Sequence, residues 1–132
     1  MDWNIGVASR TLYQEARGEP LQGQQAVAHV LVNRMRSGRW GATLASVCLT
    51  RAQFSAWGNP HDPNFYPSCA LADDDQLLIQ FAALIQAALD GETDPTGGAT
   101  SYYAASIPAP YWVSGATPCG QFGHQLVFKN VR

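Results

Sequence analysis

Charged residues are scarce in this sequence. Asp, Glu, Lys and Arg make up 14% of its 132 residues, against roughly 25% in an ordinary globular protein. The net charge is −2 and there is no long basic run. We therefore expect no nucleic-acid partner, because binding to phosphates depends on clustered Lys and Arg. Solubility must depend instead on Ser, Thr, Asn, Gln and Gly, and such a surface suits a neutral polar polymer.

Long apolar runs are absent as well. No segment approaches the roughly 20 apolar residues that a helix needs to cross a bilayer, so we expect no stable membrane association. The start, Met1–Asn4, has neither the basic residues nor the apolar stretch of a signal peptide. We therefore expect a protein that is made in the cytoplasm without an export signal of its own. We also expect a monomer.

The three cysteines cannot all pair with one another. Two interpretations stay open at this point. Either Cys48 and Cys69 form a single bridge, as the nearest pair in the sequence, or all three thiols, including that of Cys119, are reduced and partly buried.

No pattern for a metal or a cofactor occurs. A catalytic zinc site needs three converging His, Cys or Asp ligands, but the sequence has no His-x-x-x-His, His-x-His or Cys-x-x-Cys pair. It also has no glycine-rich phosphate loop and no serine elbow. We therefore predict no metal and no cofactor. The scattered histidines are His29, His61 and His124.

The hydrophobic pattern predicts one α+β domain over residues 1–132, mostly helical, with a small β element near the C-terminus. Apolar residues make up 46% of the chain and recur at helical spacing over most of its length. Pro- and Gly-rich turns predict loops at residues 59–68 and between the two strands. The expected helices span residues 3–17, 20–38, 43–49 and 73–89, with a short turn within 51–57, and the expected strands span residues 100–104 and 125–129.

Two glutamates flank a corner between the first two expected helices. Gly18 ends one helix and Pro20 starts the next, so Glu15 would be held rigidly near a helix end. In an apolar groove, burial would raise the pKa of this carboxyl and suit it to general acid catalysis. Spacing alone favours a surface ion pair with Arg17 or Arg34 instead.

Glu19 allows two interpretations as well. It could be a second catalytic carboxylate, which a retaining hydrolase needs at roughly 5 Å from the first and an inverting hydrolase at about 6.5–9.5 Å. Alternatively, it orders the corner between the helices. We favour the structural role for Glu19.

Several blocks of the sequence resemble one known family. The longest is Tyr13–Gln24, which contains Tyr-Gln-Glu-Ala-Arg-Gly-Glu, and it is followed by Ala26–Arg34, Gln53–Ala56, Asp94–Tyr103 and Gly123-His124. In this order they resemble the SleB-type cell-wall hydrolase family, which includes spore-cortex-lytic enzymes and phage lysins. The blocks span nearly the whole chain, so the resemblance is specific.

The resemblance implies a lysozyme-like fold and one essential glutamate, Glu15. It implies cleavage of peptidoglycan glycan strands between N-acetylmuramic acid and N-acetylglucosamine, most often by lytic transglycosylation, in which one carboxylate serves as acid and then as base. A true muramidase that uses water is the alternative chemistry. The non-enzymatic alternative is a glycan-binding module or a virion structural module.

Other residues are candidates for substrate binding. Of the two adjacent tyrosines, one should face the core and one the groove, and we favour Tyr103 as the groove residue that contacts Glu15 or a sugar. Trp57 and Trp112 are expected in loops, where each could either stack on a sugar or fill a small hydrophobic core. The chain departs from the family pattern after Tyr103, where Ala104-Ala105 replace Asn and Pro. The predicted substrate-binding residues are Gln24, Gln53, Ser55, Tyr102, Tyr103 and His124.

With no export signal expected, the resemblance suggests a phage or prophage endolysin. Such an enzyme accumulates in the host cytoplasm and acts on the cell wall after a holin-type membrane opening.

Overall fold

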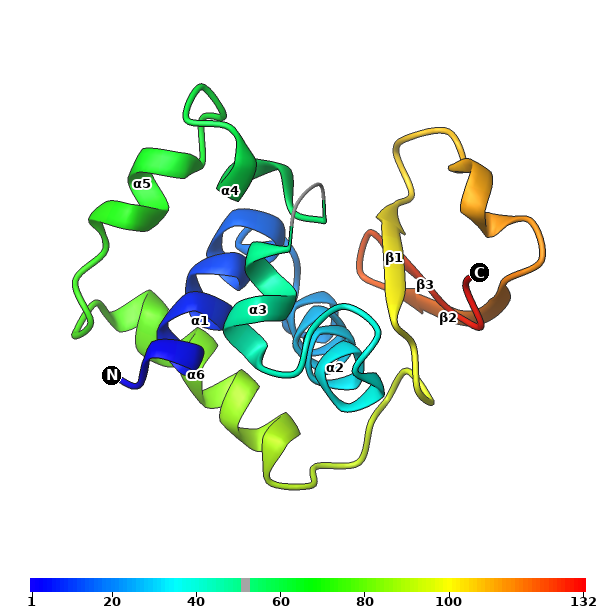
Figure 1. Cartoon of the computed structure of the whole chain (residues 1–132), viewed down its shortest axis with the longest axis horizontal. Coiled ribbons are helices and arrows are strands. Elements are labelled where there is room, and N and C mark those ends of the chain that lie inside the picture. The colour runs from blue at the N-terminus through cyan, green and yellow to red at the C-terminus, as the bar shows by residue number, and fades with distance from the viewer. Residues whose placement is uncertain (51–52) are drawn as a thin grey trace.

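The computed structural model describes residues 1–50 and 53–132. Helices form one part of the molecule and a small antiparallel sheet lies beside them (Figure 1). The chain is therefore mostly helical with a C-terminal sheet, as the hydrophobic pattern predicts. The helices are α1 (Trp3–Ala16), α2 (Leu21–Ser37), α3 (Leu44–Leu49), α4 (Ser55–Gly58), α5 (Phe65–Ala70) and α6 (Gln76–Leu89), the strands are β1 (Ser101–Ala104), β2 (Thr117–Phe122) and β3 (Gln125–Lys129), and a 3-10 turn, η1, spans Tyr111–Val113.

Local signals place the ends of the long helices. Asp2 caps α1 by accepting a hydrogen bond from the Ile5 backbone N–H at 3.1 Å. Asp75 caps α6 by accepting from two backbone N–H groups, because its carboxylate satisfies donors that have no partner within the helix. Gly38 ends α2 with a φ of 73°, a conformation that glycine adopts without strain.

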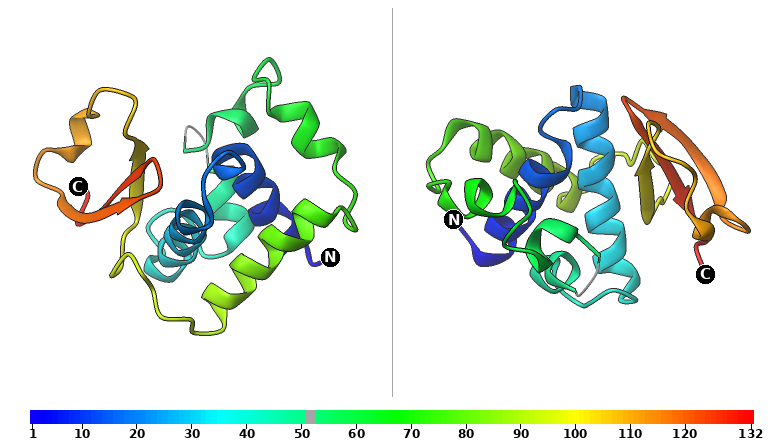
Figure 2. Two further views of the ribbon diagram at one scale, coloured as in Figure 1. Left: turned by 180° about the vertical axis from the view of Figure 1, so that it is seen from behind. Right: turned by 90° about the horizontal axis from the view of Figure 1, so that it is seen from above.

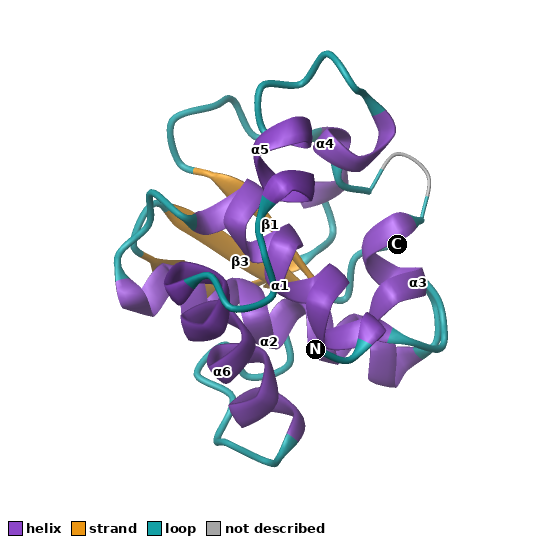
Figure 3. Ribbon diagram, turned by 90° about the vertical axis from the view of Figure 1, so that its left-hand side faces the viewer, coloured by secondary structure: helices purple, strands orange, loops and turns teal. Residues whose placement is uncertain are grey.

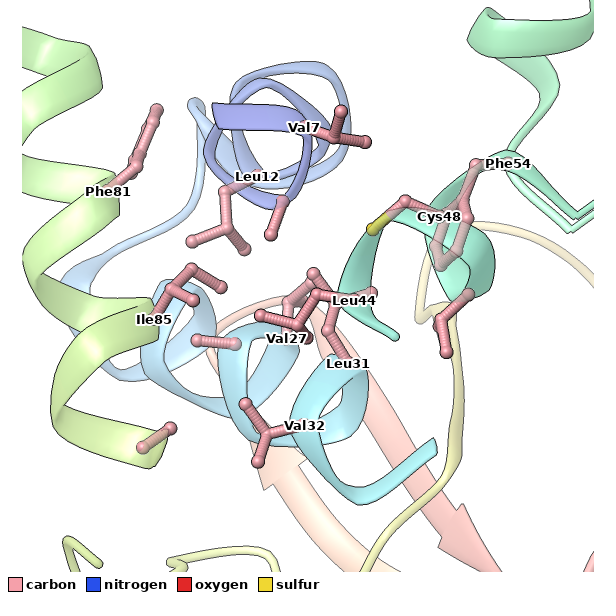
Figure 4. Close-up of a cluster of buried hydrophobic side chains, with 14 of the residues drawn as sticks. Val7, Leu12, Val27, Leu31, Val32, Leu44, Cys48, Phe54, Phe81 and Ile85 are labelled. Atoms are coloured by element: carbon pink, nitrogen blue, oxygen red, sulfur yellow. The ribbon is translucent and has the colours of Figure 1, made fainter. Parts of the chain in front are cut away.

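The main core lies where α1, α2, α3 and α6 meet (Figure 4). Leu12, Leu31 and Phe81 are fully buried there, each from a different helix. Burying such side chains stabilises the fold by about 1.5–3 kcal/mol each. These contacts hold α1 rigidly, and α1 carries the glutamate that the sequence singles out.

Helix α2 is buried on two sides. One face packs into the main core, and the other carries Ala26 and Val30, which pack against Ala99 and Val127 beside and within the sheet. The view from above shows α2 between the other helices and the sheet (Figure 2). The small side chain of Ala26 on this second face allows the sheet to approach the helix closely.

The sheet has the strand order β1-β3-β2, and both pairings are antiparallel. Seen from the side of the helices, the strands lie behind them (Figure 3). The pattern predicts β1 and β3 within one residue, but the expected loop between them contains a third strand, β2. This part of the prediction is wrong because Pro118 and Gly120 are residues typical of loops, so the segment lacks the residue pattern of a strand. They flank an irregularity in the pairing, and β2 is an edge strand, where proline is tolerated.

A second expected loop contains a short helix. The loop prediction for residues 59–68 is wrong at its end, where α5 begins at Phe65. Pro67 lies in the first turn, where its missing N–H costs no hydrogen bond. The buried Ser68 hydroxyl accepts a hydrogen bond from Gln14 of α1 at 2.9 Å, so a contact distant in sequence fixes this helix.

All three cysteines are free thiols in the structure, so the Cys48–Cys69 bridge is not formed. Burial raises the pKa of Cys48 to about 11.

Within residues 1–50 and 53–132, no helix has the length and hydropathy to cross a membrane.

Asp94 orders the turn between α6 and the sheet. Its carboxylate accepts hydrogen bonds from Asn33, from the backbone and hydroxyl of Thr96, and from the Gly98 backbone. Although burial raises the pKa of Asp94, these hydrogen bonds outweigh it and lower the pKa below 3.8. The stabilisation is therefore present above the unfolded pKa and is lost as pH falls through the lower folded pKa.

We expect Asp94→Ala to lower the free energy of unfolding by about 2–4 kcal/mol, because it leaves several donors without an acceptor. Urea unfolding at pH 7 measures this loss. Asp90→Ala is the matched control, since Asp90 is exposed and, among the described residues, its side chain accepts only from Gln86. A loss no larger than that of the control would contradict the assignment.

Candidate active site

Glu15 lies near the end of α1 and is partly buried. Its neighbours Leu12 and Ala16 are fixed in the main core, so the backbone at Glu15 has little freedom. The carboxylate points toward the sheet, where the Tyr102 hydroxyl donates a hydrogen bond to Oε1 at 2.6 Å. A residue of α1 and a residue of β1, 87 positions apart in sequence, thus form the centre of the site.

Tyr102, and not Tyr103, is the tyrosine that contacts Glu15. Strand residues alternate between the two faces of a sheet, and Tyr102 pairs with the buried Val127 on the face toward α2. Tyr103 lies on the other face and packs against Phe128 and Trp112, with ring centroids 5.7 and 6.0 Å away. The prediction that Tyr103 contacts Glu15 is therefore wrong, and its role as a sugar-binding residue stays a prediction.

Arg34 brings a buried positive charge close to Glu15. Only 7% of the residue is exposed. Its Nε donates to the Thr100 carbonyl and its Nη1 donates to Gln53 at 3.3 Å. The guanidinium lies over the rings of Trp40 and Phe54, at 4.9 and 5.3 Å from their centroids. The burial of Arg34 could have been predicted from the sequence, because Arg34 continues the buried α2 stripe of Val27, Val30 and Leu31 at helical spacing.

The surroundings of Glu15 favour its protonated form. Burial is the largest influence and raises the pKa of Glu15 above 4.5, and the negative charge of Asp62 raises it further. The hydrogen bond from Tyr102 and the charge of Arg34 lower the pKa without reversing the shift. Burial, together with Glu15, also holds the pKa of Tyr102 well above 10. Tyr102 therefore stays a hydrogen-bond donor while Glu15 exchanges a proton.

A polar cleft adjoins Tyr102 on the side of Arg34. It has a volume of about 400 Å³. Residues from α2, the segment after it, β1, the η1 turn and the C-terminal residues line it. Among the predicted binding residues, Gln53 and Tyr102 reach it, and Trp112 forms part of its wall. Besides Tyr102, its charged and aromatic lining residues are Arg34, Arg39, Trp40, Tyr111, Trp112 and Arg132.

Glu19 holds the helix corner to the β2–β3 turn. Its Oε1 accepts from the His124 backbone at 2.7 Å, and its Oε2 lies 3.0 Å from His124 Nδ1. Gly123 has a φ of 59°, and a Cβ there would lie 2.8 Å from Pro20 and 2.9 Å from Glu19. These contacts agree with the structural role that we favour for Glu19.

Gln24 and Trp57 have hydrogen-bond partners other than Glu15. Gln24 donates to the Glu19 carbonyl at the corner. Trp57 is in α4, not in a loop, and its indole donates to Thr11 at 2.9 Å. Ser55 begins α4, but its side chain lies outside the described residues. Substrate binding by Gln24, Ser55 and His124 stays a prediction.

Asp62 is a residue that the sequence did not single out. Its charge influences Glu15, and its side chain accepts from the Asn64 backbone at 2.8 Å, which orders the loop before α5. Nothing in the local sequence indicates that this Pro-rich loop returns to the end of α1.

In the part of the chain that the structure describes, no group of three His, Cys, Asp or Glu side chains could hold a metal ion.

Two solved structures have this fold. The catalytic domain of the Bacillus cereus SleB protein matches with a TM-score of 0.76 and 25% identity, over 96% of this chain and 89% of that one. The catalytic domain of the germination-specific lytic transglycosylase SleB from Bacillus anthracis matches with a TM-score of 0.75 and 26% identity, over 98% and 97% of the two chains. The predicted lysozyme-like fold is confirmed.

The family described as Cell Wall Hydrolase matches residues 18–128. This chain therefore belongs to the cell wall hydrolase family, which confirms the SleB-type resemblance. The match begins three residues after Glu15, so it does not itself include the candidate acid.

Curated relatives extend the similarity. The spore cortex-lytic enzyme of Halalkalibacterium halodurans is 31% identical over 114 residues, or 85% of this chain and 30% of that protein. The spore cortex-lytic enzyme of Oceanobacillus iheyensis is 28% identical over 128 residues, or 96% of this chain and 41% of that protein. The second match covers nearly the whole chain and so includes the end of α1. The chain spans less than half the length of these relatives.

Proposed function

We propose that this chain cleaves the glycan strands of peptidoglycan between N-acetylmuramic acid and N-acetylglucosamine, as a lytic transglycosylase with Glu15 as its acid and base. The observation that carries the proposal is the partly buried Glu15, whose raised pKa and hydrogen bond from Tyr102 suit a general acid. The family and the similarity to a solved lytic transglycosylase support it.

The reaction needs one carboxyl group in two protonation states. Protonated Glu15 gives its proton to the glycosidic oxygen as the bond from muramic C1 to that oxygen breaks. The muramic C6 hydroxyl attacks C1, and its proton passes to the Glu15 carboxylate. A 1,6-anhydro end forms, and Glu15 returns to its starting state without consuming water.

The neighbours of Glu15 suit these two states. Tyr102 donates to Oε1, which orients the carboxyl and stabilises the carboxylate that forms during the reaction. The buried charge of Arg34 also favours this carboxylate. Burial opposes ionisation before substrate is cleaved, so Glu15 keeps a proton to donate.

A muramidase that uses water is the second candidate. Asp62 favours it, since a second carboxylate close enough to influence Glu15 could activate water. Glu19 is a weaker candidate for that role, because both its oxygens are occupied by His124. A glycan-binding module without catalysis is a third reading, but binding alone does not require a carboxyl with a raised pKa.

Digestion of peptidoglycan in H₂¹⁸O separates these chemistries. We expect mass spectrometry to show 1,6-anhydro-muramic ends without ¹⁸O. Reducing muramic ends that carry ¹⁸O would instead indicate a muramidase, and Asp62→Asn should then abolish their formation. Reducing N-acetylglucosamine ends would show that a different bond is cleaved.

We also propose that the protein reaches the wall through a holin-type opening, as a phage or prophage endolysin would. Expression in a bacterial host should cause lysis only when a pore-forming membrane protein is produced with it. Lysis without the pore would contradict this route.

A further inference from the structure

The polar cleft beside Tyr102 collects positive charge. Arg34 and Arg39 line it, and so does Arg132, the last residue of the sequence, which bears an α-carboxylate beside its guanidinium. Among the described residues, neither Arg34 nor Arg39 lies within ion-pair distance of a carboxylate. In a chain with a net charge of −2, a cleft lined by two arginines that are not ion-paired suits an anionic ligand.

Trp40 holds two of these arginines in place. The Arg34 and Arg39 guanidiniums lie 4.9 and 4.8 Å from the centroid of its ring. Arg34 is fixed further by Thr100 and Gln53, and Arg39 by a hydrogen bond to the Val131 carbonyl. Holding two like charges around one ring opposes their mutual repulsion, and an anion that binds both would relieve it.

The cleft is connected to the catalytic centre through Tyr102, which lines it and donates its hydroxyl to Glu15. A strand whose glycosidic bond lies at Glu15 therefore has this cleft next to it. The exposed ring of Tyr111 and the ring of Trp112 offer apolar surface beside the arginines. In a peptidoglycan strand only the muramic residue bears carboxylates, since N-acetylglucosamine is neutral.

We propose that this cleft is a subsite for a carboxylate carried by the muramic residue. The carboxylate is that of the lactyl group in a peptide-free strand, or one of those on the stem peptide in a substituted strand. Planar guanidiniums bind carboxylates through paired hydrogen bonds while their faces stack on aromatic rings, as those of Arg34 and Arg39 do on Trp40. This subsite rests on the proposed function, because it takes the substrate from it.

Equilibrium binding to the whole chain tests the subsite without turnover, with tryptophan fluorescence as the signal. Three disaccharides of N-acetylglucosamine and N-acetylmuramic acid serve as probes. One has a free lactyl carboxylate, one carries L-alanyl-D-isoglutamine on it, and one is its neutral lactyl methylamide. We expect the methylamide to bind about tenfold more weakly than at least one anionic probe, and the tighter anionic probe identifies the source of the carboxylate.

Arg39→Gln tests the residues, because Arg39 is exposed and its loss should not disturb folding. We expect about five- to tenfold weaker binding of the anionic probes and an unchanged affinity for the methylamide. Arg36→Gln removes the same charge from α2, but Arg36 contacts the end of α6 instead of the cleft, so it should change neither affinity.

Equal binding of all three probes, or equal effects of Arg39→Gln and Arg36→Gln, would overturn the subsite. The outcome is separate from the proposed cleavage. Probes that bind as expected beside uncut peptidoglycan would refute the cleavage alone, and cut peptidoglycan with charge-independent binding would refute the subsite alone.

Discussion

Glu15→Gln should lower the rate of peptidoglycan cleavage by about a thousandfold or more, because glutamine keeps the shape of the side chain but cannot donate or accept the reacting proton. The Tyr102 hydroxyl can still donate to the amide oxygen, so the site keeps its geometry. Turbidity loss of a peptidoglycan suspension measures the rate.

The same variant should unfold at a temperature equal to or above that of the wild type. Burial raises the pKa of Glu15 in the folded state, so ionisation opposes folding. This cost is absent below the unfolded pKa and grows as pH rises toward the folded value. Glutamine removes the cost at neutral pH, and a thermal melt of the variant shows whether lost activity reflects lost folding.

Glu19→Gln is the matched control. It makes the same chemical change four residues away, at a carboxylate that binds His124 and orders the corner. We expect its activity to stay within about fivefold of wild type, because a partly exposed ion pair contributes little. A loss as large as that of Glu15→Gln would contradict the division of roles between the two glutamates.

Tyr102→Phe should move the alkaline limb of the pH–rate profile to higher pH. The hydroxyl hydrogen bond lowers the pKa of Glu15, so its removal raises that pKa further and Glu15 keeps its proton over a wider range. We also expect the maximal rate to fall about tenfold or more, because the carboxylate that forms loses an oriented donor. Initial rates between pH 4 and 9 measure both effects.

Tyr103→Phe tests whether this effect belongs to one tyrosine. The Tyr103 ring packs against Phe128 and Trp112 on the opposite face of the sheet, so loss of its hydroxyl should leave the alkaline limb in place. An equal shift in both variants, or a shift to lower pH in Tyr102→Phe, would show that the hydrogen bond does not control Glu15.

Much of the helical part could be predicted because its signals are local. Asp2, Gly38 and the acidic residues before α6 mark helix ends through backbone hydrogen bonds and allowed φ values. The apolar stripe of α6 recurs at helical spacing and is buried at Leu78, Phe81 and Ile85. The position of Glu15 near the end of α1 follows from the same local pattern.

The rest depends on contacts between distant segments. Which tyrosine of the pair faces Glu15 is decided by the register of β1 against β3, and alternation within one strand does not reveal that register. The irregular edge strand β2 could not be predicted because Pro118 and Gly120 are residues typical of loops. Helix α5 could not be predicted because it depends on the contact between Gln14 and Ser68. Asp62 approaches Glu15 only because the loop before α5 returns to α1.

The central claim is that Glu15 alone supplies and recovers the proton that cleaves the strand. Mass spectrometry of the products released from one peptidoglycan preparation by the wild type, Glu15→Gln and Glu19→Gln tests it most directly. We predict 1,6-anhydro-muramic ends from the wild type and Glu19→Gln, and none from folded Glu15→Gln. Anhydro ends released by Glu15→Gln at a rate near that of the wild type would contradict the claim.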